Sequence, residues 1–117
     1  MSYMLVIVEP PDHRNSRSEV ELRDLYESMV RYSEALKAKG LLTLSQSLKD
    51  DTRAARVKVR NGAASVIDGP FAEAKELIGG ILMLTCDTRE QAIAIAEQCP
   101  AAQWATIEVR ELGPCFQ

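Results

Sequence analysis

Histidine, cysteine and aromatic residues are scarce in this chain of 117 residues, which has one histidine, three cysteines and 5% aromatic residues. The cysteines are odd in number and widely spaced, so they show neither a disulfide framework nor zinc-ligand spacing. We therefore expect no metal site and a reducing, cytoplasmic setting. The one histidine, His13, lies in a polar loop, where we expect it to be solvated, with a chemical role as the alternative.

Excess basic charge and long apolar runs are also missing. The formal net charge is −3, which disfavours a nucleic-acid partner because such partners usually need a basic face. No apolar run approaches the roughly 20 residues that span a bilayer, and no basic segment precedes an apolar stretch at the start of the chain. We expect neither a membrane nor a nucleic acid as partner. The apolar content of 46% fits one globular domain over residues 1–117.

Hydrophobic periodicity predicts an alternation of strands and helices. A first helix is predicted between a capping box, at Ser16–Glu19 or Ser18–Glu21, and Gly40. Its inner face carries residues at spacings of three and four, namely Leu22, Leu25, Tyr26, Met29, Ser33 and Leu36. A second helix is predicted after a capping box at Asp87–Glu90. Strands are predicted over residues 3–8, 41–48, 56–60, 63–67, 81–85 and 104–110.

Two turn signals organise the middle of the chain. Asn61-Gly62 predicts a tight hairpin between two strands, of which the first alternates in a way that predicts half-burial. Asp68-Gly69-Pro70-Phe71 predicts a sharp turn, with Gly69 supplying unusual backbone angles and Pro70 opening a short helix over residues 71–77. Gly79-Gly80 predicts a further turn, and it lacks the spacing of a dinucleotide-binding loop. We therefore expect no nucleotide or other cofactor.

Asp68-Gly69-Pro70-Phe71, followed by Ala72-Glu73-Ala74-Lys75-Glu76 and Gly79-Gly80, resembles the DGPF branch of the YCII-related family. Supporting similarity runs from Tyr3-Met4-Leu5 through residues 57–62 to residues 107–110. The resemblance implies a ferredoxin-like α+β fold that pairs into a dimeric α/β barrel. The predicted order, βαβ, hairpin and βαβ, is a split βαβ arrangement with an inserted β-hairpin. Because two helices cover one sheet face, a second copy of the chain is expected to cover the other.

The leading hypothesis is a homodimer that binds a small polar or anionic metabolite in a cleft near the DGPF turn, with lyase- or isomerase-like acid–base chemistry. The predicted catalytic residues are Asp68, Glu76 and Tyr26. The predicted binding residues are Lys75, Arg56, Glu73, Gly69, Pro70 and Phe71. Lys75 and Arg56 would hold the anionic group.

Each of these residues also has a purely structural interpretation. Asp68 can cap the turn, and the charges from Glu73 to Glu76 can form a solvated helical turn. For Phe71 we favour a core side chain that anchors the turn over a ring that stacks on a ligand.

The sequence departs from relatives that carry a histidine on the first helix paired with a following aspartate. Met29 occupies the matching helix position here, and Leu41, Leu42 and Thr43 follow Gly40. The reactions inferred from those relatives, such as dehalogenation or lyase chemistry on small chlorinated acids, are therefore not expected. Tyr32 is predicted to lie off the inner helix face, which leaves Tyr26 as the helix residue with acid–base capacity. Two alternatives stay open: a non-catalytic sensor or regulatory module linked to sigma-factor systems, as the family's gene context implies, and a dimer in which the DGPF turn only locks the fold.

Overall fold

An antiparallel sheet of four strands forms the centre of the computed structural model, which describes residues 2–71 and 73–117. Its strand order is β2-β5-β1-β6, and the bounds are β1 (Ser2–Glu9), β2 (Leu42–Ser47), β5 (Leu77–Thr85) and β6 (Thr106–Glu111). Strands β3 (Ala55–Arg60) and β4 (Ala63–Asp68) pair with each other in a separate two-stranded sheet. The predicted mixed α+β class is confirmed.

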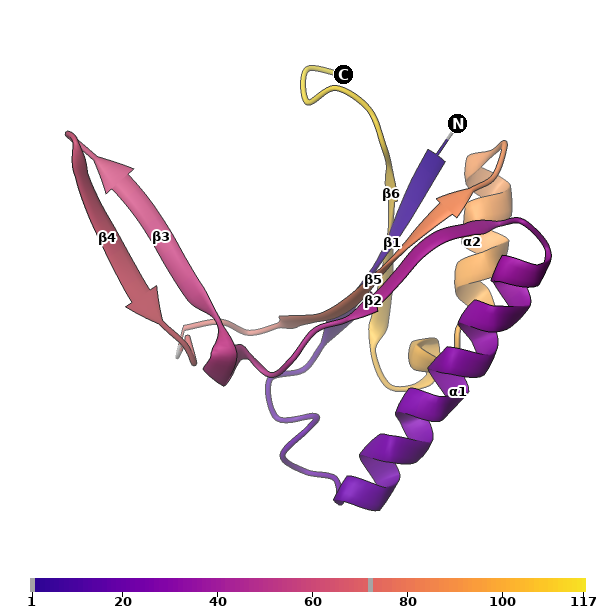
Figure 1. Ribbon diagram of the computed structural model, residues 1–117, viewed down its shortest axis with the longest axis horizontal. Coiled ribbons are helices and arrows are strands. Elements are labelled where there is room, and N and C mark those ends of the chain that lie inside the picture. Colours follow the sequence, from indigo (N-terminus) through magenta and orange to yellow (C-terminus); the bar gives the residue numbers. More distant parts are fainter. Residues whose placement is uncertain (1, 72) are drawn as a thin grey trace.

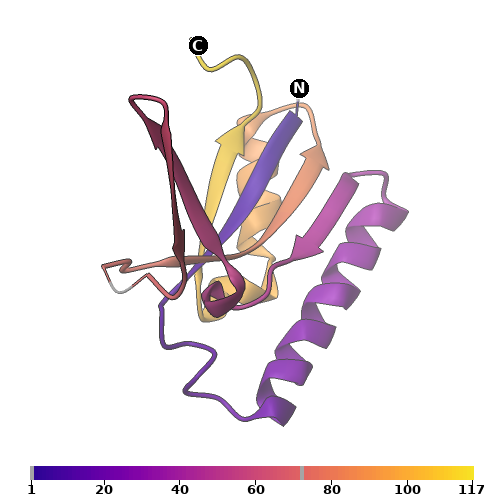
Figure 2. The same cartoon turned by 60° about the vertical axis from the view of Figure 1, so that its left-hand side comes forward.

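Both α-helices cover the same face of the four-stranded sheet (Figures 1 and 2). They are α1 (Glu19–Ala38) and α2 (Arg89–Glu97), and the short 3-10 helices are η1 (Asp51–Arg53) and η2 (Pro100–Gln103). The observed order, βαβ, hairpin and βαβ, is the one predicted. Among the described residues, no helix combines the length and apolarity needed to cross a membrane.

The helix starts follow from local capping chemistry. Ser18 caps α1, and its hydroxyl accepts a bond of 3.1 Å from the Glu21 N–H while the Glu21 carboxylate accepts one from the Ser18 N–H. This confirms the second of the two predicted boxes. The box predicted at Asp87–Glu90 is wrong by one residue. Thr88 caps α2 by accepting from the Gln91 N–H, because the Thr88 backbone is extended and α2 begins only at Arg89.

The core lies between this sheet face and the helices. Alternation along β1 turns Tyr3, Leu5 and Ile7 inward, where they meet Leu82 and Leu84 of β5. Tyr32 contradicts the prediction that it lies off the inner helix face. Its hydroxyl donates to the Ile95 carbonyl and ties α1 to α2, and burial raises the pKa of Tyr32.

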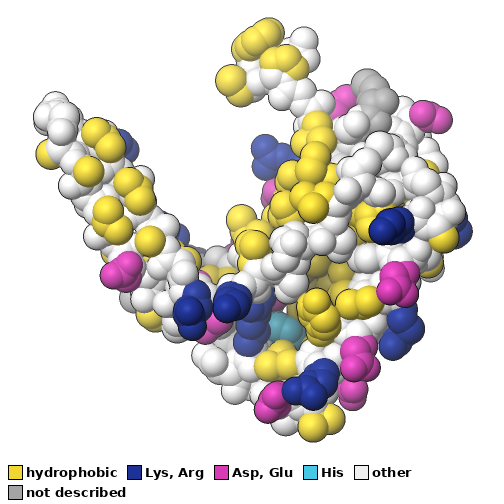
Figure 3. Space-filling view, in the orientation of Figure 1, with side chains coloured by type: hydrophobic (Ala, Val, Ile, Leu, Met, Phe, Trp, Pro, Cys, Tyr) yellow, Lys and Arg dark blue, Asp and Glu magenta, His cyan; other side chains and the backbone are white. Residues whose placement is uncertain are grey.

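The opposite sheet face is open to solvent, and every second residue of β1 points toward it. Met4, Val6 and Val8 of β1 point to this side and are only half-buried. The β3–β4 hairpin projects across a gap from this face, and hydrophobic side chains gather on both (Figures 1 and 3). Val57 and Val66 form a cross-strand pair on the hairpin and are 65% and 63% exposed. The predicted half-burial of β3 is therefore wrong within one chain, because no other described segment covers the hairpin.

The segment between β4 and β5 differs most from its prediction. Residues 71 and 73–76 are not helical, and Ala72 lies outside the described residues. Strand β5 begins at Leu77, so Gly79 and Gly80 lie within a strand and not at a turn. Pairing of Ile78 with Val8 and of Gly80 with Ile7 and Ser47 draws the chain into the sheet, which overrides the local preference for a helix.

Candidate functional site

A cavity of about 880 Å³ lies between α1 and the sheet. The inner face of α1 supplies one wall, as predicted from its spacing, through Leu22, Leu25, Tyr26, Met29 and Ser33. The sheet supplies the other wall through Ile7, Leu42, Leu82 and neighbouring residues. Most of this surface is apolar, so the cavity suits a small organic molecule with a largely hydrophobic body.

Hydroxyl groups interrupt the apolar walls. The Ser33 hydroxyl of α1 lies 2.9 Å from the Ser45 hydroxyl of β2, and this hydrogen bond joins the two walls. Tyr26 also lines the cavity and is 57% exposed. These groups can donate to or accept from a ligand without introducing a net charge.

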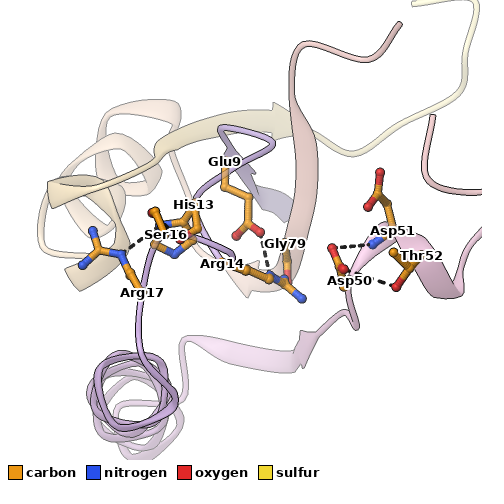
Figure 4. Close-up of polar contacts among 9 residues, drawn as sticks. All are labelled: Glu9, His13, Arg14, Ser16, Arg17, Asp50, Asp51, Thr52 and Gly79. Atoms are coloured by element: carbon orange, nitrogen blue, oxygen red, sulfur yellow. Dashed lines mark hydrogen bonds and ion pairs between the residues drawn. The ribbon is translucent and has the colours of Figure 1, made fainter. Parts of the chain in front are cut away.

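One end of the cavity holds a buried ion pair. Glu9, the last residue of β1, is only 3% exposed although it carries a carboxyl group, and Arg14 Nε donates to its Oε1 at 2.7 Å. Arg14 Nη2 lies 3.4 Å from the Gly79 carbonyl oxygen, so the side chain bridges β1 and β5 (Figure 4). The guanidinium compensates the charge that burial would otherwise make costly.

Gly79 makes room for this pair. A Cβ at Gly79 would collide with the Glu9 carboxylate and would lie 3.3 Å from Arg14 Nη2. A Cβ at Gly80 would lie 3.0 Å from the Gln46 carbonyl oxygen of the neighbouring strand. The two glycines are therefore needed for close approach inside the sheet, whereas the sequence predicted a turn.

His13 lies beside the ion pair, and its predicted solvation is wrong. It is 7% exposed, and its ring stacks on Trp104 with centroids 4.3 Å apart and planes inclined by 3°. Its Nδ1 accepts a hydrogen bond of 3.1 Å from Arg17 Nε (Figure 4). Burial is the main cause that lowers the pKa of His13, so the neutral imidazole is favoured. His13, Arg14 and Trp104 all line the cavity.

The predicted site residues divide into two groups that the fold keeps apart. Tyr26 lines the cavity, whereas none of residues 68–71 and 73–76 does. Near the DGPF turn, Arg56 Nη1 lies 2.8 Å from Glu73 Oε1, and the Arg56 guanidinium lies 3.9 Å from the centroid of the Phe71 ring. Phe71 is half-buried outside the core cluster, so the favoured core position is not observed. Glu73 already partners Arg56, and these exposed groups form a local surface cluster.

The other residues of the turn have different surroundings. Asp68 is exposed at the end of β4, and its carboxylate makes no hydrogen bond to another described residue. Gly69 does not have a positive φ; a Cβ there would collide with the Asp51 carbonyl oxygen, and its N–H donates to the Ala54 carbonyl at 2.9 Å. The Gly69–Pro70 peptide bond is cis. Lys75 and Glu76 are exposed beside a smaller hollow of about 270 Å³ that Val8 and Trp104 also line.

The polar end of the cavity was missed by the sequence prediction. Glu9, His13 and Arg14 stand in a stretch of mixed polar residues and prolines that is typical of a loop. One signal was present: Glu9 continues the alternation of Tyr3, Leu5 and Ile7 and therefore falls on the core-facing side. Among the described residues, no group of three or more His, Cys, Asp or Glu side chains could hold a metal ion.

Comparison with known proteins places the chain in a family. The model of the YCII-related domain matches residues 1–115. This chain belongs to the YCII-related family. The YCII-related chain is 34% identical over 94 residues to the uncharacterized protein R00369 of Rhizobium meliloti (strain 1021), a match that covers 79% of this chain and 73% of that protein.

A solved structure with the same fold is the 5-chloro-2-hydroxyhydroquinone dehydrochlorinase TftG from Burkholderia phenoliruptrix AC1100, in complex with 2,5-dihydroxybenzoquinone. The TM-score is 0.57, and the match covers 97% of the YCII-related chain and 94% of TftG. Sequence identity is 15%, so this likeness supports the fold alone.

Proposed function

We propose that this YCII-related protein is a homodimer that binds a small organic molecule in the cavity between α1 and the sheet. The cavity itself carries the proposal, because its volume of about 880 Å³ lies within the usual range of small-molecule sites. Its apolar walls suit a hydrophobic or aromatic body, and its hydroxyls and polar end suit one oxygenated edge. The TftG complex with 2,5-dihydroxybenzoquinone, a small oxygenated ring, is consistent with a ligand of this class.

This proposal moves the ligand away from the DGPF turn. For the turn we propose a structural role, namely fixing the hairpin to the sheet. Gly69 supports it, since it packs against η1 and its N–H donates to the carbonyl of Ala54, which directly precedes β3. Arg56 and Glu73 add an ion pair between β3 and the segment that leads to β5. Of the predicted catalytic residues, Tyr26 stays in the proposed site as a hydrogen-bonding hydroxyl.

A thermal-shift and calorimetric screen against small aromatic and anionic metabolites tests the location of the ligand. Ser33→Phe places a ring in the cavity, whereas Ala35→Phe adds the same ring on an exposed part of α1 that does not line the cavity. We expect wild type, Ala35→Phe and Asp68→Ala to respond to the same ligand and Ser33→Phe to lose the response. A ligand lost with Asp68→Ala and kept with Ser33→Phe would place the site at the DGPF turn and contradict the proposal.

The open sheet face supports the homodimer. Met4, Val6, Ile81 and Met83 lie on adjacent strands of this face and are partly exposed, with Val57 and Val66 exposed on the hairpin. An apolar sheet face that lies opposite an exposed apolar hairpin is unusual on a monomer and suits an interface between copies.

Sedimentation equilibrium tests the dimer. We expect a mass twice the 13.0 kDa of one chain. Met83→Glu should shift the protein toward the monomer because it places a charge on the open face. Val20→Glu, at an exposed position of α1, is the matched control and should leave the mass unchanged. A monomeric wild type at high micromolar concentration would overturn this part of the proposal.

A further inference from the structure

His13 is held in one orientation by contacts on several sides. Its backbone N–H donates to the Pro10 carbonyl at 3.1 Å, and its carbonyl accepts from the Ser16 hydroxyl at 3.0 Å. The ring is stacked on Trp104, and Arg17 Nε donates to Nδ1. Arg17 thereby sets the chemical form of the ring. A guanidinium N–H can only donate, so Nδ1 must be the unprotonated nitrogen, and the neutral imidazole carries its proton on Nε2.

The second nitrogen of this ring makes no hydrogen bond to any other described residue. Of the fully enclosed side-chain nitrogen and oxygen atoms in the described part of the chain, Trp104 Nε1 alone has no partner. Since His13 Nε2 has no partner among the described residues and yet is not one of these enclosed atoms, it keeps accessible surface although the residue is only 7% exposed. His13 is one of the residues that line the cavity under α1.

We propose that the His13 Nε2–H is a fixed, neutral hydrogen-bond donor for the ligand of this cavity, with Arg17 as the residue that positions it. This inference rests on the proposed function and names the ligand class more closely. The ligand has an apolar body with a carbonyl, phenolate or carboxylate oxygen that accepts from Nε2. A donor whose orientation is fixed before binding loses little entropy when the ligand arrives, and an acceptor-free ligand leaves it unsatisfied.

The arrangement also explains why the donor lies at this end of the cavity. The neighbouring Glu9 carboxylate accepts from Arg14 through Oε1 and makes no hydrogen bond to the His13 ring. Leu22, Leu25 and Met29 line the cavity from α1 and would contact the apolar body of the ligand. The oxygen of the ligand would then face His13 while its hydrocarbon part lies along α1.

Nitrogen NMR of the single histidine tests the inference directly. In uniformly ¹⁵N-labelled protein at pH 8, we expect Nε2 to be protonated and Nδ1 to be unprotonated. Arg17→Ala should remove the preference and give a mixture of the two tautomers, whereas Arg23→Ala, on α1, should leave it intact. A protonated Nδ1 in wild type, or a tautomer unaffected by Arg17→Ala, would overturn the assignment of the donor and of Arg17.

Ligand titrations separate this inference from the proposed function. The probes are 2,5-dihydroxybenzoquinone and benzoate, with toluene as a control that lacks an acceptor oxygen. We expect an oxygenated probe to shift the NMR resonances of both the Met29 methyl group and His13 Nε2, and toluene to shift the Met29 resonance alone. His13→Phe keeps a stacked ring but removes the donor. It should weaken binding of the oxygenated probes about tenfold and leave binding of toluene unchanged.

Each remaining result contradicts a named claim. A Met29 shift with no response at His13 Nε2 for the oxygenated probes would overturn the donor while leaving the cavity as a binding site. No Met29 shift with any of the three probes would overturn both the proposed function and the inference that rests on it. Equal weakening of toluene and the oxygenated probes by His13→Phe would assign His13 a packing role and overturn the donor.

Discussion

Arg14 Nε lies 2.7 Å from Glu9 Oε1, and this ion pair occupies a core-facing position at the end of β1. The Glu9 side chain is only 3% exposed, and that of its partner Arg14 is 25% exposed. The pair links the middle of the loop before α1 to β1 and, through the Gly79 carbonyl, to β5. It therefore fixes the polar end of the cavity to the middle of the sheet.

Arg14→Ala should be strongly destabilising because it leaves a buried carboxylate without its partner. We expect a loss of about 3 kcal/mol in the free energy of unfolding, measured from the urea midpoint with an unchanged slope. Arg110→Ala is the control, because it removes the exposed Arg110–Glu108 pair and should cost less than about 1 kcal/mol. Similar losses for the two variants would contradict the importance of burial at Glu9.

Gly79→Ala tests whether the missing side chain at Gly79 makes room for the ion pair. The added Cβ would displace the Glu9 carboxylate, so we expect a loss of about 2 kcal/mol, as for other overpacked sites. Gly113→Ala is a suitable control, since its Cβ would meet only the Gln117 side chain, at 3.6 Å. Thermal unfolding of both variants gives the comparison, and an unchanged midpoint for Gly79→Ala would contradict the steric account.

His13 should make stability fall as the solution is acidified below about pH 6.5. Burial lowers the pKa of His13 in the folded state, with Arg17 and Arg14 acting in the same direction and Glu9 and Asp12 opposing them. The unfolded chain, with an ordinary pKa near 6.5, takes up the proton first, so it gains stability relative to the folded chain. The stabilisation that His13 contributes is complete above about pH 6.5, and it is lost as the pH falls toward the lower pKa that His13 has in the folded state.

Urea unfolding of wild type and His13→Phe between pH 7.5 and pH 5.5 measures this effect. The variant cannot titrate at this position, so its stability should fall less over the interval than that of wild type. The difference between the two slopes isolates His13 from the carboxylates that both proteins share. Parallel slopes would show that His13 titrates alike in the folded and unfolded chains.

Gly69→Ala separates the structural role of the DGPF turn from its charged side chains. The added Cβ would collide with the Asp51 carbonyl oxygen, which is backbone and cannot move aside cheaply, so we expect a loss of about 2 kcal/mol. Arg56→Ala removes an exposed ion pair and a contact with Phe71 and should cost about 1 kcal/mol or less. Thermal unfolding would contradict this account if Arg56→Ala were the more damaging change.

Local sequence patterns were sufficient to predict most of the fold. The Ser18–Glu21 box, the inner face of α1 and the Asn61-Gly62 turn depend on neighbours within a few residues, and all three are observed. Predictions were wrong where distant segments decide the outcome. Residues 71–77 read as a helix, yet pairing of β5 with β1 and β2 fixes the end of this segment as a strand.

The polar end of the candidate site could not be predicted for the same reason. His13 is buried by Trp104, which lies 91 positions later in the chain, and Arg14 contacts the carbonyl of Gly79 across 65 positions. Periodicity within a short window contains no information about such contacts. Tyr26, by contrast, lies on the inner helix face that local spacing predicts, and it lines the cavity although it is 57% exposed.

Binding of a small molecule under α1 is the central claim, and methionine methyl NMR tests it most directly. Met29 lines the cavity, while Met4 and Met83 lie on the open sheet face. When protein labelled with methyl-¹³C-methionine is titrated with the oxygenated aromatic probes, the Met29 methyl resonance should shift until it saturates. The Met4 and Met83 resonances should stay unchanged. Shifts confined to Met4 and Met83, or no shift at Met29 with any probe, would contradict the account.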